Sequence, residues 1–163
     1  MNLYRIAQLN VSMHAQGETL IKQGRSYLVK QDEPAEPDMT ICIPDEYLEQ
    51  KHAENPHLSI NDCEYIWTGS AFYNQLINFD GIMLHASAVA VDGKAYLFSA
   101  PSGTGKSTHT ALWRQYFGRD RAVIINDDKP ALRFTEGKLW AFGTPWSGKT
   151  DQNLNVKVEV ASI

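Results

Sequence analysis

The stretch Ala100-Pro101-Ser102-Gly103-Thr104-Gly105-Lys106-Ser107 decides the expected fold, because it joins an apolar strand pattern (residues 96–98) to a helical pattern (residues 108–117). Glycines let backbone N–H groups close around phosphate oxygens, and the N-terminus of the following helix adds a partial positive charge. The stretch therefore predicts a phosphate-binding loop in which Lys106 contacts phosphates and the Ser107 hydroxyl binds Mg²⁺. The strict pattern opens with glycine and this one with Ala100, so we expect a backbone without positive φ there.

A second stretch, Gly143-Thr144-Pro145-Trp146-Ser147-Gly148-Lys149-Thr150, matches the strict spacing of such a loop. Its context argues against that function, because proline has no N–H and tryptophan is bulky where a loop must approach phosphate. Residues 153–160 then alternate polar and apolar, which predicts a strand and no helix. We expect this stretch to be a turn between strands or a substrate loop.

Length and composition indicate a globular protein. The chain has 163 residues, 43% hydrophobic residues and a net charge of −4, so it is long enough for a core and gives no reason to expect a nucleic-acid partner. No apolar run reaches the roughly 20 residues that a membrane helix needs, and residues 1–5 lack the form of a secretory signal. Cys42 and Cys63 have no metal-type spacing, which favours two buried thiols in a reducing cytoplasm.

The N-terminal part carries no motif. We expect a strand at residues 3–11, short β-like runs at 19–21, 26–29 and 39–43, and an exposed acidic loop at 31–38. A short helix opens at residues 44–46 and ends by residues 55–56, followed by a strand at 58–67. Ser70 is the expected N-cap of a helix whose buried stripe comprises Phe72, Tyr73, Leu76, Ile77 and Phe79.

A hairpin precedes the glycine-rich stretch. Residues 82–91 read as one strand, Asp92-Gly93 is a two-residue turn signal, and residues 94–99 form the returning strand. In this register Val91 pairs with Lys94, which places His85 opposite Ala100 at the mouth of the expected phosphate site. His85 is therefore a candidate contact for metal or phosphate, whereas we expect Ser87, on the same face, to serve packing.

A pair of acids follows the next strand. We expect Leu112, Trp113, Tyr116 and Phe117 to form the buried side of the helix after the loop, and Gly118 to end it. Residues 122–125 are an apolar strand that ends in Asn126-Asp127-Asp128. A turn is the plain interpretation of those polar residues, but a carboxylate at a strand end downstream of a phosphate loop is typical of a Mg²⁺ site. One acid can bind the metal while its neighbour acts as general base. Residues 131–134 and 138–142 form a hairpin around residues 135–137.

Three segments together resemble a known family. Leu84-His85-Ala86-Ser87-Ala88-Val89, then residues 102–107, then Asn126-Asp127-Asp128, resemble the kinase domain of HPr kinase/phosphorylase. The same order is similar to the nucleotide core of ATP-dependent phosphoenolpyruvate carboxykinase. The resemblance covers about residues 80–130. The glycine- and arginine-containing signature that follows the acids in true HPr kinases is not evident, and residues 143–149 look like the corresponding segment of uncharacterised relatives.

The resemblance implies an α/β fold with an α+β-like mixed sheet and a P-loop core. From the strand patterns we expect residues 1–69 to form a small β-rich part, and residues 70–163 to form the nucleotide-binding domain. Such domains continue beyond the point that corresponds to Ile163, so a shortened domain is one expectation. The resemblance also implies site roles. Lys106, Asp127 as base and His85 would be catalytic, and Ser107 and Asp128 would bind metal. The residues expected to bind ATP are Ser102, Gly103, Thr104, Gly105, Lys106, Ser107 and Thr108.

The expected function is ATP- and Mg²⁺-dependent transfer of the γ-phosphoryl group to a hydroxyl, most simply a serine. Two alternatives stay open, a carboxykinase-like enzyme acting on a small oxo-acid and a non-catalytic nucleotide-binding domain. The expected partners are nucleotide and a hydroxyl-bearing acceptor, with no nucleic acid and no membrane, in the cytoplasm. Related enzymes of the family assemble into homo-oligomers, but no feature of this sequence demands it.

Overall fold

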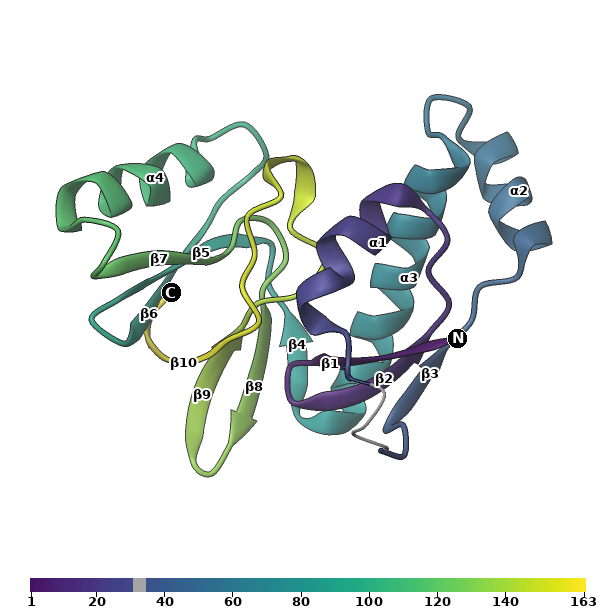
Figure 1. Ribbon diagram of the computed structural model, residues 1–163. Helices are drawn as coiled ribbons and strands as arrows, with labels where there is room; N and C mark the ends of the chain where they lie inside the picture. The colour runs from purple at the N-terminus through teal and green to yellow at the C-terminus, as the bar shows by residue number, and fades with distance from the viewer. Residues whose placement is uncertain (31–34) are drawn as a thin grey trace.

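A seven-stranded mixed sheet forms the larger layer of the molecule (Figure 1). The computed structural model describes residues 1–30 and 35–163, and the strand order in this sheet is β4-β8-β9-β10-β6-β5-β7. Only β10 and β6 are parallel, and the other neighbours are antiparallel, which confirms the expected mixed sheet. The strands are β4 (Gly81–Met83), β5 (Ala86–Val91), β6 (Lys94–Ser99), β7 (Ala122–Asn126), β8 (Ala131–Thr135), β9 (Lys138–Phe142) and β10 (Lys157–Ser162).

The N-terminal part is a three-stranded sheet with helices beside it, on the side of the molecule away from α4 (Lys106–Phe117) in Figure 1. The single strand expected at residues 3–11 is wrong, because Ala7 and Gln8 turn the chain with φ of 51° and 64° and divide it into a hairpin. The expected acidic loop at 31–38 lies partly outside the described residues. The elements are β1 (Asn2–Ile6), β2 (Leu9–Met13), α1 (Glu18–Gly24), β3 (Met39–Ile41), α2 (Asp45–Glu54) and α3 (Ile60–Leu76), with 3-10 turns at Arg25–Tyr27 and Ile77–Phe79.

The strand expected at residues 58–67 is wrong, since residues 60–67 form the start of helix α3. The N-cap is Ser59 and not Ser70: its side chain accepts a hydrogen bond from the Asp62 N–H, and the Asp62 carboxylate accepts one from the Ser59 N–H. This capping box satisfies two backbone donors at the start of the helix. The stripe at 72–76 is buried as expected, but Ile77 is exposed.

The β-like run expected at residues 19–21 is also wrong, and a contact between residues distant in sequence explains why. Residues 19–21, expected as β-like, lie in α1, where the buried Glu64 carboxylate accepts hydrogen bonds from the backbone N–H groups of Gln16 and Gly17 at 2.7 and 2.5 Å. These contacts hold the start of α1 against α3. The β-like run expected at residues 26–29 is instead a 3-10 turn and the residues after it, with a single β-bridge between Tyr4 and Leu28. The strand β3 and the helix α2 are confirmed. Cys63 is buried as expected, but Cys42 is exposed.

The hairpin before the glycine-rich stretch is confirmed in turn and register. Val91 pairs with Lys94 and Ala86 with Ser99. The preceding strand is broken, however, because β4 pairs with β8 whereas β5 pairs with β6 and β7. Residues 84 and 85 connect the two strands, so His85 lies one residue beyond the ladder, beside the end of β6.

Helix α4 packs on the sheet through a narrower face than expected. Trp113 contacts Tyr96, Phe98 and Phe117 with ring centroids 5.1–5.6 Å apart. Leu112 and Tyr116 were expected on this face but are 55% and 84% exposed. The packed stripe is Thr110, Trp113 and Phe117, which follows the three- and four-residue spacing of one helix face.

One core joins the two layers. The fully buried Trp146, from the loop between β9 and β10, stacks on Phe72 of α3 with a centroid distance of 5.0 Å. A Cβ atom at Gly69 would lie 2.9 Å from the Trp146 ring, so glycine there allows the indole to approach α3. Arg133 of β8 also donates a hydrogen bond to the Ala7 carbonyl at 2.8 Å. A division after residue 69 would fall inside α3, which is continuous.

Candidate functional site

Four segments meet around a cavity of about 500 Å³, which we call the main cavity. They are the glycine loop (residues 100–105) with the start of α4, the link between β4 and β5, the end of β7, and the β9–β10 loop (residues 143–156). The residues lining the main cavity are His85, Ser102, Gly103, Gly105, Lys106, Ser107, Thr108, Asp127, Asp128, Ser147, Gly148, Lys149 and Thr150. The structure thus brings together every site residue predicted from the sequence except Thr104.

The glycine loop links β6 to α4, as the sequence predicts. Gly103 and Gly105 have φ of 82° and 92°, in the left-handed region that favours glycine, whereas Ala100 is absent from the positive-φ residues, as expected. Helix α4 begins directly after Gly105. The Lys106 ammonium donates to the carbonyls of Ala100 and Pro101 at 2.8 and 3.3 Å, so it lies folded back over the loop.

One buried carboxylate oxygen of Asp127 has no partner among the residues that the structure describes. The residue is 5% exposed, and its Oδ1 accepts a hydrogen bond from Ser87 Oγ at 2.5 Å. Oδ2 makes no hydrogen bond with any residue that the structure describes. A buried, unpartnered carboxylate oxygen is costly, so this atom is available to a ligand of the cavity.

Asp128, in contrast, has partners for both oxygens. Its Oδ1 lies 3.3 Å from Nε2 of His85, and its Oδ2 is paired with the Lys129 ammonium. Gly148 packs against the same side chain, and a Cβ atom there would lie 3.0 Å from the Asp128 Cβ. His85 thus reaches the cavity as predicted, but its contact is with an acid.

Several residues that shape the site were missed by sequence reasoning. Ser87 bonds Asp127 and also lies 2.7 Å from Thr110 Oγ1 of α4, so its role exceeds packing. Asn126 orders the turn of the acids, because its Oδ1 accepts from the N–H groups of Asp128 and Lys129 at 2.9 and 2.7 Å. The signal for Asn126 was present, since an Asn side chain commonly bonds the backbone two residues on.

Tyr65 of α3 ties the N-terminal layer to the cavity. Its hydroxyl accepts a hydrogen bond from the Gly148 N–H at 3.0 Å and donates one to Gln23 Oε1 at 2.8 Å. Burial raises the pKa of Tyr65 to about 12, so the hydroxyl stays protonated at neutral pH. No sequence pattern connects position 65 with position 148.

The second glycine-lysine-threonine stretch is a turn between strands, as expected. Residues Gly148–Thr150 form a single 3-10 turn, with no α-helix after it before β10. Residues 147–150 of the β9–β10 loop lie on the wall of the main cavity together with the glycine loop. The exposed Lys149 is therefore a second cation on that wall.

A second cavity of about 630 Å³ adjoins the glycine loop. It shares Gly105, Lys106 and Thr108 with the main cavity, and it contains Thr104. Its apolar wall includes Phe98, whose ring lies 4.5 Å from that of His109. The two cavities therefore place a partly aromatic surface next to the glycine loop.

The main cavity supplies some of the oxygen ligands that a cation such as Mg²⁺ needs. Mg²⁺ prefers oxygen ligands and keeps several waters, and the Ser107 hydroxyl and the Asp127 and Asp128 carboxylates all line the main cavity. The described residues contain no group of three or more His, Cys, Asp or Glu side chains placed to hold a metal by themselves. A cation here would therefore depend on further oxygen ligands from water or substrate.

No family model, curated protein or solved structure matches this chain. Within the described part of the chain, no helix is long and apolar enough to cross a membrane.

Proposed function

We propose that the chain is an ATP-dependent phosphotransferase of the HPr-kinase-like class, with a phosphoenolpyruvate carboxykinase/HPr kinase-like P-loop core. The observation that carries the proposal is the buried, unpartnered Oδ2 of Asp127 in the same cavity as the glycine loop, Lys106 and Ser107. A loop that favours phosphate, opposite a carboxylate that can accept a proton, is the arrangement that phosphoryl transfer to a hydroxyl requires.

Each residue has a distinct role in this proposal. The glycine loop and the N-terminus of α4 bind the phosphates, and Lys106 turns from its loop carbonyls to the β- and γ-phosphates. Asp127 accepts the proton of the acceptor hydroxyl, with Ser87 fixing its other oxygen. Ser107 and Asp128 would hold Mg²⁺, which supplies charge neutralisation on the transferring phosphate.

The placement of the arginines favours this proposal over a carboxykinase-like reaction. Binding of a small oxo-acid with two carboxylates calls for arginines at the reaction site. Among the residues described, no arginine lines the main cavity. Arg133 bonds the carbonyls of Phe79 and Ala7, and Arg121 pairs with Asp92, both outside the cavity.

The test is Mg²⁺-dependent ATP turnover, measured as ADP release, in the wild type and in Asp127→Asn. Loss of the general base is expected to lower turnover by about 10²–10⁴-fold while Mg·ATP binding persists. Asp92→Asn, which changes an exposed acid paired with Arg121, is the matched control and should keep the wild-type rate. An unchanged rate in Asp127→Asn would show that the base is misassigned, and absence of nucleotide binding in the wild type would refute the proposal.

A further inference from the structure

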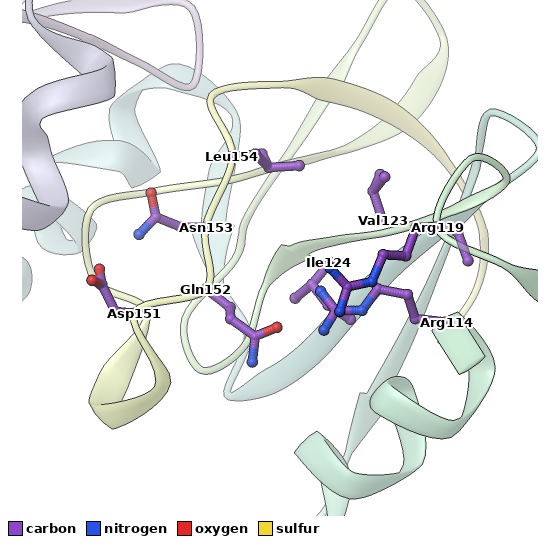
Figure 2. A pocket seen from close by; sticks show the side chains of 9 residues that line it. Arg114, Arg119, Val123, Ile124, Asp151, Gln152, Asn153 and Leu154 are labelled. Carbon is purple, nitrogen blue, oxygen red and sulfur yellow. The ribbon is translucent and has the colours of Figure 1, made fainter.

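A separate cavity of about 240 Å³ lies between the C-terminal end of α4, the outermost strand β7 and the end of the β9–β10 loop. In the view of Figure 2, the guanidinium groups of Arg114 and Arg119 both extend over Ile124, with the Gln152 amide on the opposite wall. We call it the arginine cavity. It shares no lining residue with the main cavity.

Neither arginine has an acidic partner within the part of the chain that the structure describes. Over residues 1–30 and 35–163, no ion pair joins Arg114 or Arg119 to a carboxylate, although the chain forms such pairs elsewhere, for example between Arg121 and Asp92. The one acid on the wall of the arginine cavity, Asp151, pairs with Lys22 at 2.6 Å and points away from the arginines in Figure 2. The cavity thus carries two positive charges that its own residues do not neutralise.

The end of α4 accounts for only one of these charges. Arg114 lies in the last turn of the helix, where the partial negative charge of the helix end stabilises a cation. Arg119 follows Gly118, beyond the helix, and brings a second guanidinium to the same cavity. Two like charges on one small cavity repel each other, and an anion between them offsets this repulsion.

The remaining wall strengthens the attraction for an anion. Val123, Ile124 and Leu154 supply apolar surface, and apolar walls reduce the screening of nearby charges. Gln152 adds an amide donor, whereas the Asn153 amide donates to Ser147 Oγ at 3.0 Å. Guanidinium groups form paired hydrogen bonds with phosphate oxygens, and two of them match the charge of a phosphate dianion.

We propose that the arginine cavity is a second anion site, which binds the phosphate group of a small phosphorylated molecule through Arg114 and Arg119. The site also has a physical connection to the main cavity. The β9–β10 loop lines both, with residues 147–150 on one and 151–154 on the other, and the Gln152 carbonyl accepts a hydrogen bond from the Asp127 N–H at 3.1 Å.

The test is titration of inorganic phosphate into the ¹⁵N-labelled full chain at constant ionic strength, followed by NMR of backbone amides and arginine Nε–Hε groups. The proposal predicts saturable shifts at Arg114, Arg119 and Gln152. These shifts should disappear in the double variant Arg114→Gln/Arg119→Gln and persist in Arg121→Gln, which removes an arginine elsewhere. They should also persist in Lys106→Ala, so this result does not depend on phosphate binding at the glycine loop.

Two further experiments test whether the variant protein is folded and which class of anion binds. The Arg114→Lys/Arg119→Lys variant keeps both charges but loses the planar donors, and is expected to weaken phosphate binding by about tenfold. Succinate tests a dicarboxylate of similar charge. Absence of shifts around Gln152 in the wild type, their persistence in the glutamine variant, or a response to succinate alone would overturn the proposal.

Discussion

Ser87 Oγ donates a 2.5 Å hydrogen bond to Oδ1 of Asp127, whereas Oδ2 of the same carboxylate has no partner among the described residues. The two residues lie on neighbouring antiparallel segments, β5 and the end of β7. The bond fixes the direction in which Asp127 presents its free oxygen. Sequence reasoning found Asp127 but assigned Ser87 to packing.

Ser87→Ala should therefore affect both stability and the site. The change removes a donor from a buried carboxylate, and an unsatisfied buried group of this kind costs about 1–3 kcal/mol. We expect urea unfolding to show a loss of free energy of unfolding in that range. Ser162→Ala, on an exposed strand end, should stay within about 0.5 kcal/mol of wild type. Equal stability of Ser87→Ala and wild type would contradict the described role of this bond.

Local signals account for most of the larger sheet and of the site. The Asp92-Gly93 turn fixes the register of β5 and β6, and the glycine loop is bounded by an apolar strand and a helical pattern, so each element could be predicted from neighbouring residues. The acids at the end of β7 followed from the same strand pattern. These local elements are sufficient to place Lys106, Ser107 and Asp127 in the site.

The N-terminal layer could not be predicted in the same way. The buried face of α3 contains Glu64, Thr68 and Gly69, so its helical period is hidden in the hydrophobicity pattern. Glu64 is buried because it binds the start of α1, and Gly69 because Trp146 packs against it. Both reasons are contacts between residues distant in sequence. The interruption of the expected strand at residues 84 and 85 also results from a long-range contact, the pairing of β4 with β8.

Tyr65→Phe tests the connection between this layer and the main cavity. The variant loses the hydrogen bonds of the hydroxyl with Gly148 and Gln23 but keeps the ring, and should lose about 1–2 kcal/mol of stability. Because Gly148 lies on the cavity wall, nucleotide affinity should fall several-fold, which calorimetry can measure. Tyr47→Phe, on the exposed face of α2, is the control. Unchanged stability and affinity in Tyr65→Phe would show that the hydrogen bonds of the Tyr65 hydroxyl have no effect on the main cavity.

The capping box of α3 predicts a dependence on acidity. Hydrogen bonds from Ser59 lower the pKa of Asp62, so the unfolded chain binds a proton more readily than the folded chain. This contribution to stability is present above the ordinary pKa and is lost as the pH falls through the lowered value, below about pH 4. Asp62→Asn should cost about 0.5–1 kcal/mol at pH 7 and lose less stability than wild type on acidification.

Urea unfolding at pH 7 and at pH 3 checks this difference. Asp120→Asn, in the exposed turn after α4, is a control that should follow the wild-type pH dependence. If Asp62→Asn and wild type lose the same stability between the two pH values, the capping carboxylate does not carry this effect.

We propose that the glycine loop, and not the second glycine-lysine-threonine stretch, binds nucleotide phosphates. Calorimetric titration of Mg·ATP into the wild type, Lys106→Ala and Lys149→Ala tests it most directly. We predict binding to the wild type, a loss of at least about 100-fold in affinity for Lys106→Ala, and less than about tenfold for Lys149→Ala, whose exposed side chain lies only on the cavity wall. Loss of binding in Lys149→Ala alone, or no binding in the wild type, would contradict the account.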